Sequence, residues 1–127
     1  MSDTYQGLSR SERLRSKLLW KEVMERGSTF FHYPVKLWVG DNQEAPGLQV
    51  AFVAPKRRFR RAVDRNREKR YLREAYRLSE HRPMRDLKLQ IVFLSVASAS
   101  TELKDYRKAI DALLLQLKMS PHDHQAD

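Results

Sequence analysis

The feature that most constrains this chain of 127 residues is a short segment, 56–77, that holds almost all of its surplus positive charge. The segment carries 11 Lys or Arg against 3 Asp or Glu, a net charge of +8, whereas the whole chain has a net charge of +9. Outside the segment, 14 basic residues nearly cancel against 13 acidic ones. Charge that is concentrated on one element, not spread along the chain, indicates a surface that binds a polyanion.

Most of this segment has the period of an α-helix, and we predict a helix over 62–80, ended before Pro83. On a helical wheel, one arc of about 100° carries Asn66, Lys69, Arg70, Arg73 and Arg77, flanked by Arg65 and Arg67. The opposite side carries Tyr71, Leu72, Ala75 and Leu78. We therefore expect one face to pack on a sheet and the other to present cations to a strand of phosphates.

A second group of basic residues lies in the loop ahead of this helix: Lys56, Arg57, Arg58, Arg60 and Arg61. Loop cations alone often serve only solubility, but beside the basic helix they are expected to extend the same surface. A charged helix face is commonly just solvated, yet this one nearly lacks acidic residues, and like charges at helical spacing repel each other. An anionic lipid surface is the main alternative partner, but the apolar side lacks the bulky residues of membrane-surface helices.

The rest of the chain predicts a small α+β sandwich with one layer of helices on a sheet. We expect a helix over 16–26 that ends at Gly27, strands over 28–39 with an edge or a break at Pro34, and a turn over 41–47. Strands over 48–54 and 88–97 and a helix over 102–118 complete the order α-β-β-(β)-α-β-α. The length suits one domain, 1–127, with an ordered core of about 9–119, a frayed N-terminus and a frayed tail, 120–127.

Composition argues against several other kinds of site. The chain has no Cys, so disulfides, thiolate metal sites and a Cys nucleophile are excluded, and its 4 Gly form no phosphate-binding loop. The carboxylates show none of the clustering that a two-metal nuclease needs, and Asp64 and Glu68 are explained by charge balance. We expect no metal site in the polypeptide. With neither a stretch of about 20 apolar residues nor a signal-peptide pattern, the sequence predicts a cytoplasmic protein with no membrane partner.

The order of residues within the basic helix resembles a known signature. The run RNREKR at 65–70, followed by Arg73-Glu74, is similar to the RNR signature (RNRxKRxxRE) of the bacterial ribonuclease P protein family. Lys56 in VAPK and Ala62-Val63 ahead of the run also resemble that family, and the likeness extends over about 14–118. Two departures are the absence of Gly from the loop VAPKRRFRRAV and the presence of Met24 where the family often has an aromatic residue.

The resemblance implies a fold, partners and a division of labour. It implies a left-handed β-α-β crossover, contrary to the usual right-handed rule. It implies that a catalytic RNA removes the 5′ leader of precursor tRNA by hydrolysis with Mg²⁺, bound mainly by the RNA, and that the polypeptide is an enzyme subunit, inactive alone and without an obligate protein partner. The RNA-binding candidates are then Lys56, Arg57, Arg60, Arg61, Arg65, Asn66, Arg67, Lys69, Arg70, Arg73 and Arg77.

The leader is implied to lie in a cleft between the first helix and the sheet. Single-stranded RNA stacks its bases on aromatic side chains in a positive groove, although aromatic residues in strands more often belong to the core. The candidates for contact with the leader are Trp20, Met24, Phe31, Trp38 and Phe52.

Two other functions compete with this one. The chain could be a non-catalytic RNA-binding module, such as a ribosomal or ribosome-assembly protein. Crosslinking in living cells would then recover ribosomal RNA with it instead of the ribonuclease P RNA. It could also bind DNA with the basic helix in a major groove, which predicts a preference for duplex DNA.

Overall fold

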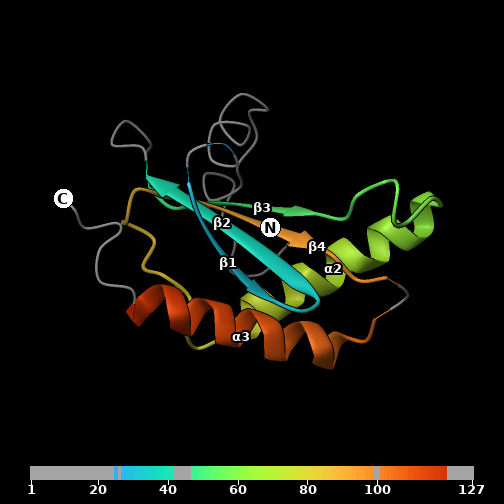
Figure 1. The fold of residues 1–127 in the computed structure, drawn as a ribbon. Coiled ribbons are helices and arrows are strands. Elements are labelled where there is room, and N and C mark those ends of the chain that lie inside the picture. Colours follow the sequence, from blue (N-terminus) through green and yellow to red (C-terminus); the bar gives the residue numbers. More distant parts are fainter. Residues whose placement is uncertain (1–24, 26, 42–46, 99–100, 120–127) are drawn as a thin grey trace, which may run out of the picture.

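The computed structural model describes residues 25, 27–41, 47–98 and 101–119, which form four strands and two helices (Figure 1). The strands are β1 (Ser28–His32), β2 (Val35–Asp41), β3 (Gln49–Val53) and β4 (Leu89–Ser95). The helices are α2 (Ala62–Leu78) and α3 (Leu103–Met119). Their order confirms the predicted α+β class, while the predicted helix over 16–26 lies, apart from Glu25, outside the described residues.

The four strands form one sheet in the order β1-β2-β4-β3. β1 and β2 are an antiparallel hairpin, in which Phe31 pairs with Lys36 and Thr29 with Trp38. The break predicted at Pro34 is therefore the turn of this hairpin, and the Tyr33–Pro34 peptide bond in it is cis. β2 is antiparallel to β4, and β3 is parallel to β4.

The parallel pair β3 and β4 is connected through α2 by a left-handed crossover. In Figure 1 the chain runs along β3, returns beneath the sheet in α2 and re-enters as β4 on the nearer side of β3. Nearly all β-α-β connections have the opposite hand. This is the hand that the resemblance implied.

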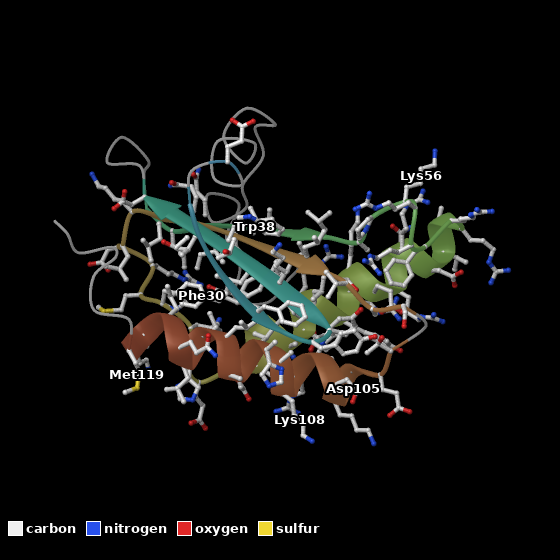
Figure 2. The ribbon with its side chains drawn as sticks, viewed as in Figure 1. Phe30, Trp38, Lys56, Asp105, Lys108 and Met119 are labelled. Carbon is white, nitrogen blue, oxygen red and sulfur yellow. The ribbon has the colours of Figure 1, made fainter. Side chains whose placement is uncertain are left out.

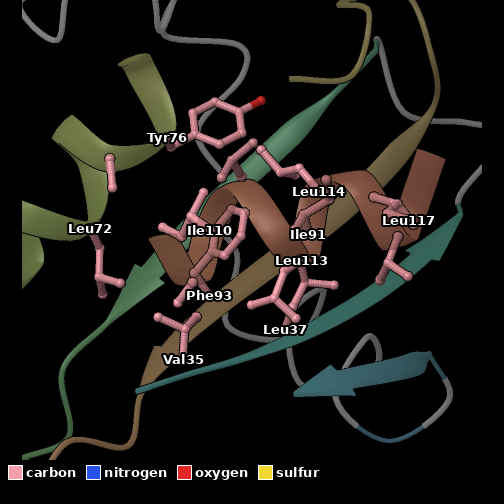
Figure 3. Packing of buried hydrophobic residues seen from close by; sticks show 14 of the residues in the cluster. Val35, Leu37, Leu72, Tyr76, Ile91, Phe93, Ile110, Leu113, Leu114 and Leu117 are labelled. Carbon is pink, nitrogen blue, oxygen red and sulfur yellow. The ribbon is translucent and has the colours of Figure 1, made fainter. Parts of the chain in front are cut away.

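Both helices cover the same face of the sheet, and the main core lies between them and the strands (Figures 1 and 3). Alternate residues of β2, Val35, Leu37 and Val39, point into this core, as the period of two along a strand requires. The residues that the helices bury there include Leu72, Tyr76, Tyr106, Ile110, Leu113, Leu114 and Leu117.

The ends of α2 differ slightly from the prediction. The helix ends at Leu78, two residues early, because Ser79 is extended (ψ 138°) and its N–H donates to the carbonyl of Tyr76 at 3.1 Å. Leu78, placed on the apolar side by its spacing, is 38% exposed, whereas Tyr76 is fully buried. The last turn of a helix has no following turn to cover it, so periodicity is a weak guide to burial there.

Candidate nucleic-acid interface

The outward side of α2 carries the predicted row of basic residues. Asn66 and Arg70 are exposed, and Lys69, Arg73 and Arg77 are half-buried along the same side of the helix. The guanidinium of Arg70 lies over the ring of Tyr71, 5.6 Å from its centre, although the residue as a whole stays exposed. The helix therefore keeps cations outward along its length, as the sequence predicted.

The loop between β3 and α2 is held by a buried aromatic side chain. Phe59 is buried against Ala54 and Ala97, whereas Lys56, Arg57, Arg60 and Arg61 are exposed around it. Arg58, also exposed, donates to the carbonyl of Val96 at 3.2 Å. An apolar residue in the middle of five cations thus fixes the loop on the protein and leaves the basic residues exposed, as Figure 2 shows for Lys56.

Arg65, the first residue of the RNR run, serves the protein's own structure as well. One of its terminal nitrogens donates to the carbonyl oxygens of Phe59 and Arg60, at 3.1 and 3.0 Å. These bonds tie the first turn of α2 to the loop. The sequence placed Arg65 only at the flank of the basic arc and gave no sign of this contact.

The acidic residues of α2 form ion pairs with neighbouring cations. Asp64 lies 3.2 Å from Arg61 and 3.7 Å from Arg67. Glu74 accepts two hydrogen bonds from Arg77, at 3.1 and 2.8 Å, and this contact holds the pKa of the Glu74 carboxyl below its usual value. Each pair directs a guanidinium along the helix surface, while a surface pair by itself adds little stability.

Glu68 differs from these because its side chain is fully buried. Its carboxylate accepts a hydrogen bond from the hydroxyl of Tyr106 at 2.5 Å and lies 3.4 Å from Arg67. Burial, together with this bond, raises the pKa of Tyr106 well above its usual value. The prediction that Glu68 serves only charge balance is therefore incomplete: it also belongs to the interface between α2 and α3.

The face of the sheet turned away from α2 and α3 carries two of the predicted leader contacts. Trp38 is 8% exposed and packs with Val92, and Phe31 on β1 is 58% exposed. The hairpin register puts both side chains on this face, where Lys36 lies opposite Phe31 and two residues before Trp38 on β2. The ammonium of Lys36 lies over the ring of Trp38, 4.9 Å from its centre. Sequence reasoning missed Lys36, although its position two residues before Trp38 on one strand was a usable signal.

Phe52, predicted for the same cleft, lies on the opposite face. Its ring stacks on Phe93 with centres 5.6 Å apart and meets Tyr76 edge-on at 5.9 Å, within the core under the helices. Phe52 thus cannot share one surface with Trp38, because alternate strand residues point to opposite faces. Trp20 and Met24, the remaining candidates, lie outside the described residues.

Within the described part of the chain, no group of three or more His, Asp or Glu side chains is placed to hold a metal ion. None of the described helices is long and apolar enough to cross a membrane. Fold and charge together define a small α+β protein with a cationic helix and loop at one side of its sheet.

Comparison with known proteins identifies the family. The family model described as Ribonuclease P matches residues 8–118. The ribonuclease P protein component of Porphyromonas gingivalis is 38% identical over 105 residues, which cover 80% of this chain and 77% of that protein. The same component from Chromohalobacter salexigens is 39% identical over 82 residues, 65% of this chain and 62% of that protein.

Solved structures agree on the fold. The RNase P protein of Staphylococcus aureus has a TM-score of 0.68 at 15% identity, covering 85% of this chain and 95% of that one. The RNase P protein of Thermotoga maritima has a TM-score of 0.66 at 20% identity, covering 81% and 94%.

The chain belongs to the ribonuclease P protein family. It is accordingly a protein subunit of the ribonuclease P enzyme, which implies a partnership with the ribonuclease P RNA and a role in 5′ processing of tRNA.

Proposed function

We propose that this chain binds the catalytic RNA of ribonuclease P through α2 and the loop before it, and the 5′ leader of precursor tRNA through the outer face of its sheet. In this proposal the RNA carries out the Mg²⁺-dependent hydrolysis, and the polypeptide increases affinity for RNA and substrate.

The observation that carries the proposal is the one-sided arrangement of charge. The exposed cations of the loop, Lys56, Arg57, Arg60 and Arg61, continue into the outward row on α2. Arg and Lys neutralise phosphates and release condensed counterions, so such a surface binds RNA with strong salt dependence. Arg also forms paired hydrogen bonds with phosphate oxygens, which suits the predominance of Arg here.

The outer sheet face supports the second half of the proposal. Phe31 offers an exposed ring, and Lys36 supplies a positive charge beside Trp38. Stacking of a base on an aromatic side chain contributes about 1–3 kcal/mol, and a nearby cation attracts the adjoining phosphate. A flexible single strand is the form of RNA that can present its bases to such a face.

Mg²⁺ enters the proposal only as an ion held by RNA. The described residues do not fit a metal site of their own, so we assign no ligand to the polypeptide and derive no step through the ion. Phosphate and other oxygen ligands of the RNA are the kind that Mg²⁺ prefers.

Reconstitution tests the main proposal. Adding the chain to its cognate ribonuclease P RNA at low Mg²⁺ should restore cleavage of the leader from precursor tRNA. The variant Arg107→Ala, which removes an exposed cation from α3 instead, is the matched control and should behave like the wild type. Absence of stimulation by the wild-type chain, or tighter binding to duplex DNA or ribosomal RNA than to this RNA, would refute the proposal.

The leader contact has a separate test. Phe31→Ala should weaken binding of precursor tRNA to the assembled enzyme by about fivefold or more, the loss of one stacked base. Affinity for mature tRNA, which has no leader, serves as the internal control and should not change. An equal loss of affinity for precursor and mature tRNA would mean that Phe31 does not act through the leader.

A further inference from the structure

Glu68 lies at the meeting point of three elements. It comes from the buried side of α2, its hydroxyl partner Tyr106 comes from α3, and Ser95, which bonds to Tyr106, is the last residue of β4. All three residues are fully buried. Position 68 falls within the run RNREKR, between two basic residues, so a residue inside this run reaches into the core.

The hydrogen bonds among these residues all lead toward the carboxylate of Glu68. The N–H of Ala97 donates to the Ser95 hydroxyl at 3.4 Å. Because the single hydroxyl proton of Tyr106 is donated to Glu68 at 2.5 Å, the 2.8 Å bond between Ser95 and Tyr106 has Ser95 as its donor. A buried carboxylate is costly without such partners, so this chain of bonds fixes the place of Glu68 in the core.

The second carboxylate oxygen of Glu68 lies beside the side chain of the preceding residue on the helix. It lies 3.4 Å from a terminal nitrogen of Arg67, which is also 3.7 Å from Asp64. The Arg67 side chain is about one-third exposed, at 34%. One end of the guanidinium is thus held by carboxylates, while part of the side chain remains open to solvent.

We propose that Glu68, fixed in the core by Tyr106, is a positioning residue that holds Arg67 in its RNA-binding orientation before RNA arrives. This inference rests on the proposed function and adds the mechanism by which one cation of the surface is preorganised. A long cationic side chain that is already restrained loses less conformational freedom when it binds. A single carboxylate buried in the core would thereby influence how the surface of α2 binds RNA.

A double-mutant cycle tests the proposal. Glu68→Gln keeps an oxygen that can accept from Tyr106 but removes the negative charge beside Arg67. Affinity for the cognate ribonuclease P RNA would be measured, with its salt dependence, for the wild type, Glu68→Gln, Arg67→Ala and the double variant. Asp111→Asn on α3 is the control, since it changes the net charge by the same amount. Thermal unfolding would establish that each variant is folded at the assay temperature.

We expect Glu68→Gln to weaken RNA binding about threefold to tenfold and to have no further effect when Arg67 is already Ala. Asp111→Asn should leave affinity the same or slightly higher. An equal loss with and without Arg67 would make Glu68 merely structural and overturn the proposal. Unchanged or tighter binding in Glu68→Gln would also overturn it, because Glu68 would then only neutralise charge.

A second variant keeps the test decisive if Glu68→Gln does not fold. Tyr106→Phe removes the hydroxyl that fixes Glu68 and should likewise weaken RNA binding only when Arg67 is present. An additive loss in that cycle would overturn the proposal. If the wild-type chain itself fails to bind the RNA, the proposed function fails; if it binds and the cycle is additive, only this inference fails.

Discussion

The two helices α2 and α3 have the same length, 17 residues, and pack side by side on one face of the sheet, yet they are built differently. α3 buries six residues, all apolar or aromatic, along one stripe. α2 buries four, of which one is the carboxylate of Glu68. α2 has six basic and three acidic residues, against four and two in α3.

The difference shows where stability and binding reside. Each apolar side chain buried by α3 contributes in proportion to the surface removed from water. α2 buries less apolar surface and keeps like charges close together, which lowers its own stability. The fold thus relies on α3 and the sheet to hold in place a helix whose exposed side is suited to a polyanion.

The largest expected effect tests how much the buried side of α3 contributes to stability. Leu113→Ala removes a fully buried side chain of α3 and should lower the free energy of unfolding by about 2–5 kcal/mol. Leu115→Ala, two residues away but 41% exposed, is the matched control and should change it by less than about 0.5 kcal/mol. Urea unfolding measures both. Similar decreases in the two variants would contradict the assignment of α3 to the core.

The next effect separates the helices by binding. Replacing Lys69 and Arg70 together by Ala should weaken RNA binding by about tenfold. The slope of log affinity against log salt should fall by about one for each phosphate that the variant no longer neutralises. The unfolding free energy should change little. The control, Arg107→Ala on α3, should alter neither the affinity nor the slope. A filter-binding titration at several salt concentrations would show whether the two helices in fact behave alike.

A smaller effect concerns a residue that serves both roles. Arg65→Ala removes the two bonds to the carbonyls of Phe59 and Arg60 and should lower the unfolding free energy by about 1 kcal/mol. Asn66→Ala, at the exposed neighbouring position, should change the unfolding free energy by less than about 0.5 kcal/mol, as is usual for a surface substitution. Thermal unfolding of both variants measures the difference. Equal melting temperatures of the two variants would mean that Arg65 adds no stability to the fold and that its only role is in binding RNA.

The smallest effect concerns pH and the pair of Glu74 with Arg77. The pKa of Glu74 is lower in the folded protein than its usual value of 4.5, chiefly because Arg77 donates to it. Its contribution to stability is therefore present above pH 4.5 and is lost as the pH falls through the lowered pKa. Acid unfolding of Glu74→Gln should lack this small dependence, and a wild-type and variant pair with identical acid profiles would show that the ion pair adds nothing.

Local patterns were sufficient to predict most of the fold. The strands over 48–54 and 88–97 and the helix over 102–118 were found within about two residues, because period and turn residues are local signals. The outward row on α2 was predicted for the same reason. Local patterns could not predict the left-handed crossover, because the hand of a connection depends on how distant elements pack.

The faces of the sheet were harder to predict, and the hairpin shows why. In a single strand over 28–39, Phe31 and Trp38 would point to opposite faces, being seven residues apart. The turn at Tyr33–Pro34 reverses the chain and sets the register so that Phe31 pairs with Lys36, on the face of Trp38. Phe52 lies on the face opposite Trp38 because of the register between β3 and β4, which pairs it with Phe93 and is also a tertiary property. The partnership of Glu68 with Tyr106 joins residues 38 positions apart, which no local pattern reveals.

The parallel course of β3 and β4 has a further electrical consequence. Since both strands point toward the same end of the sheet, α2 and α3, which follow them, also begin toward that end (Figure 1). A helix carries a partial positive charge at its N-terminus, so two aligned macrodipoles point their positive poles the same way. Backbone and side chains thus reinforce one potential, and an approaching polyanion would be steered to that end at a rate that falls as ionic strength rises.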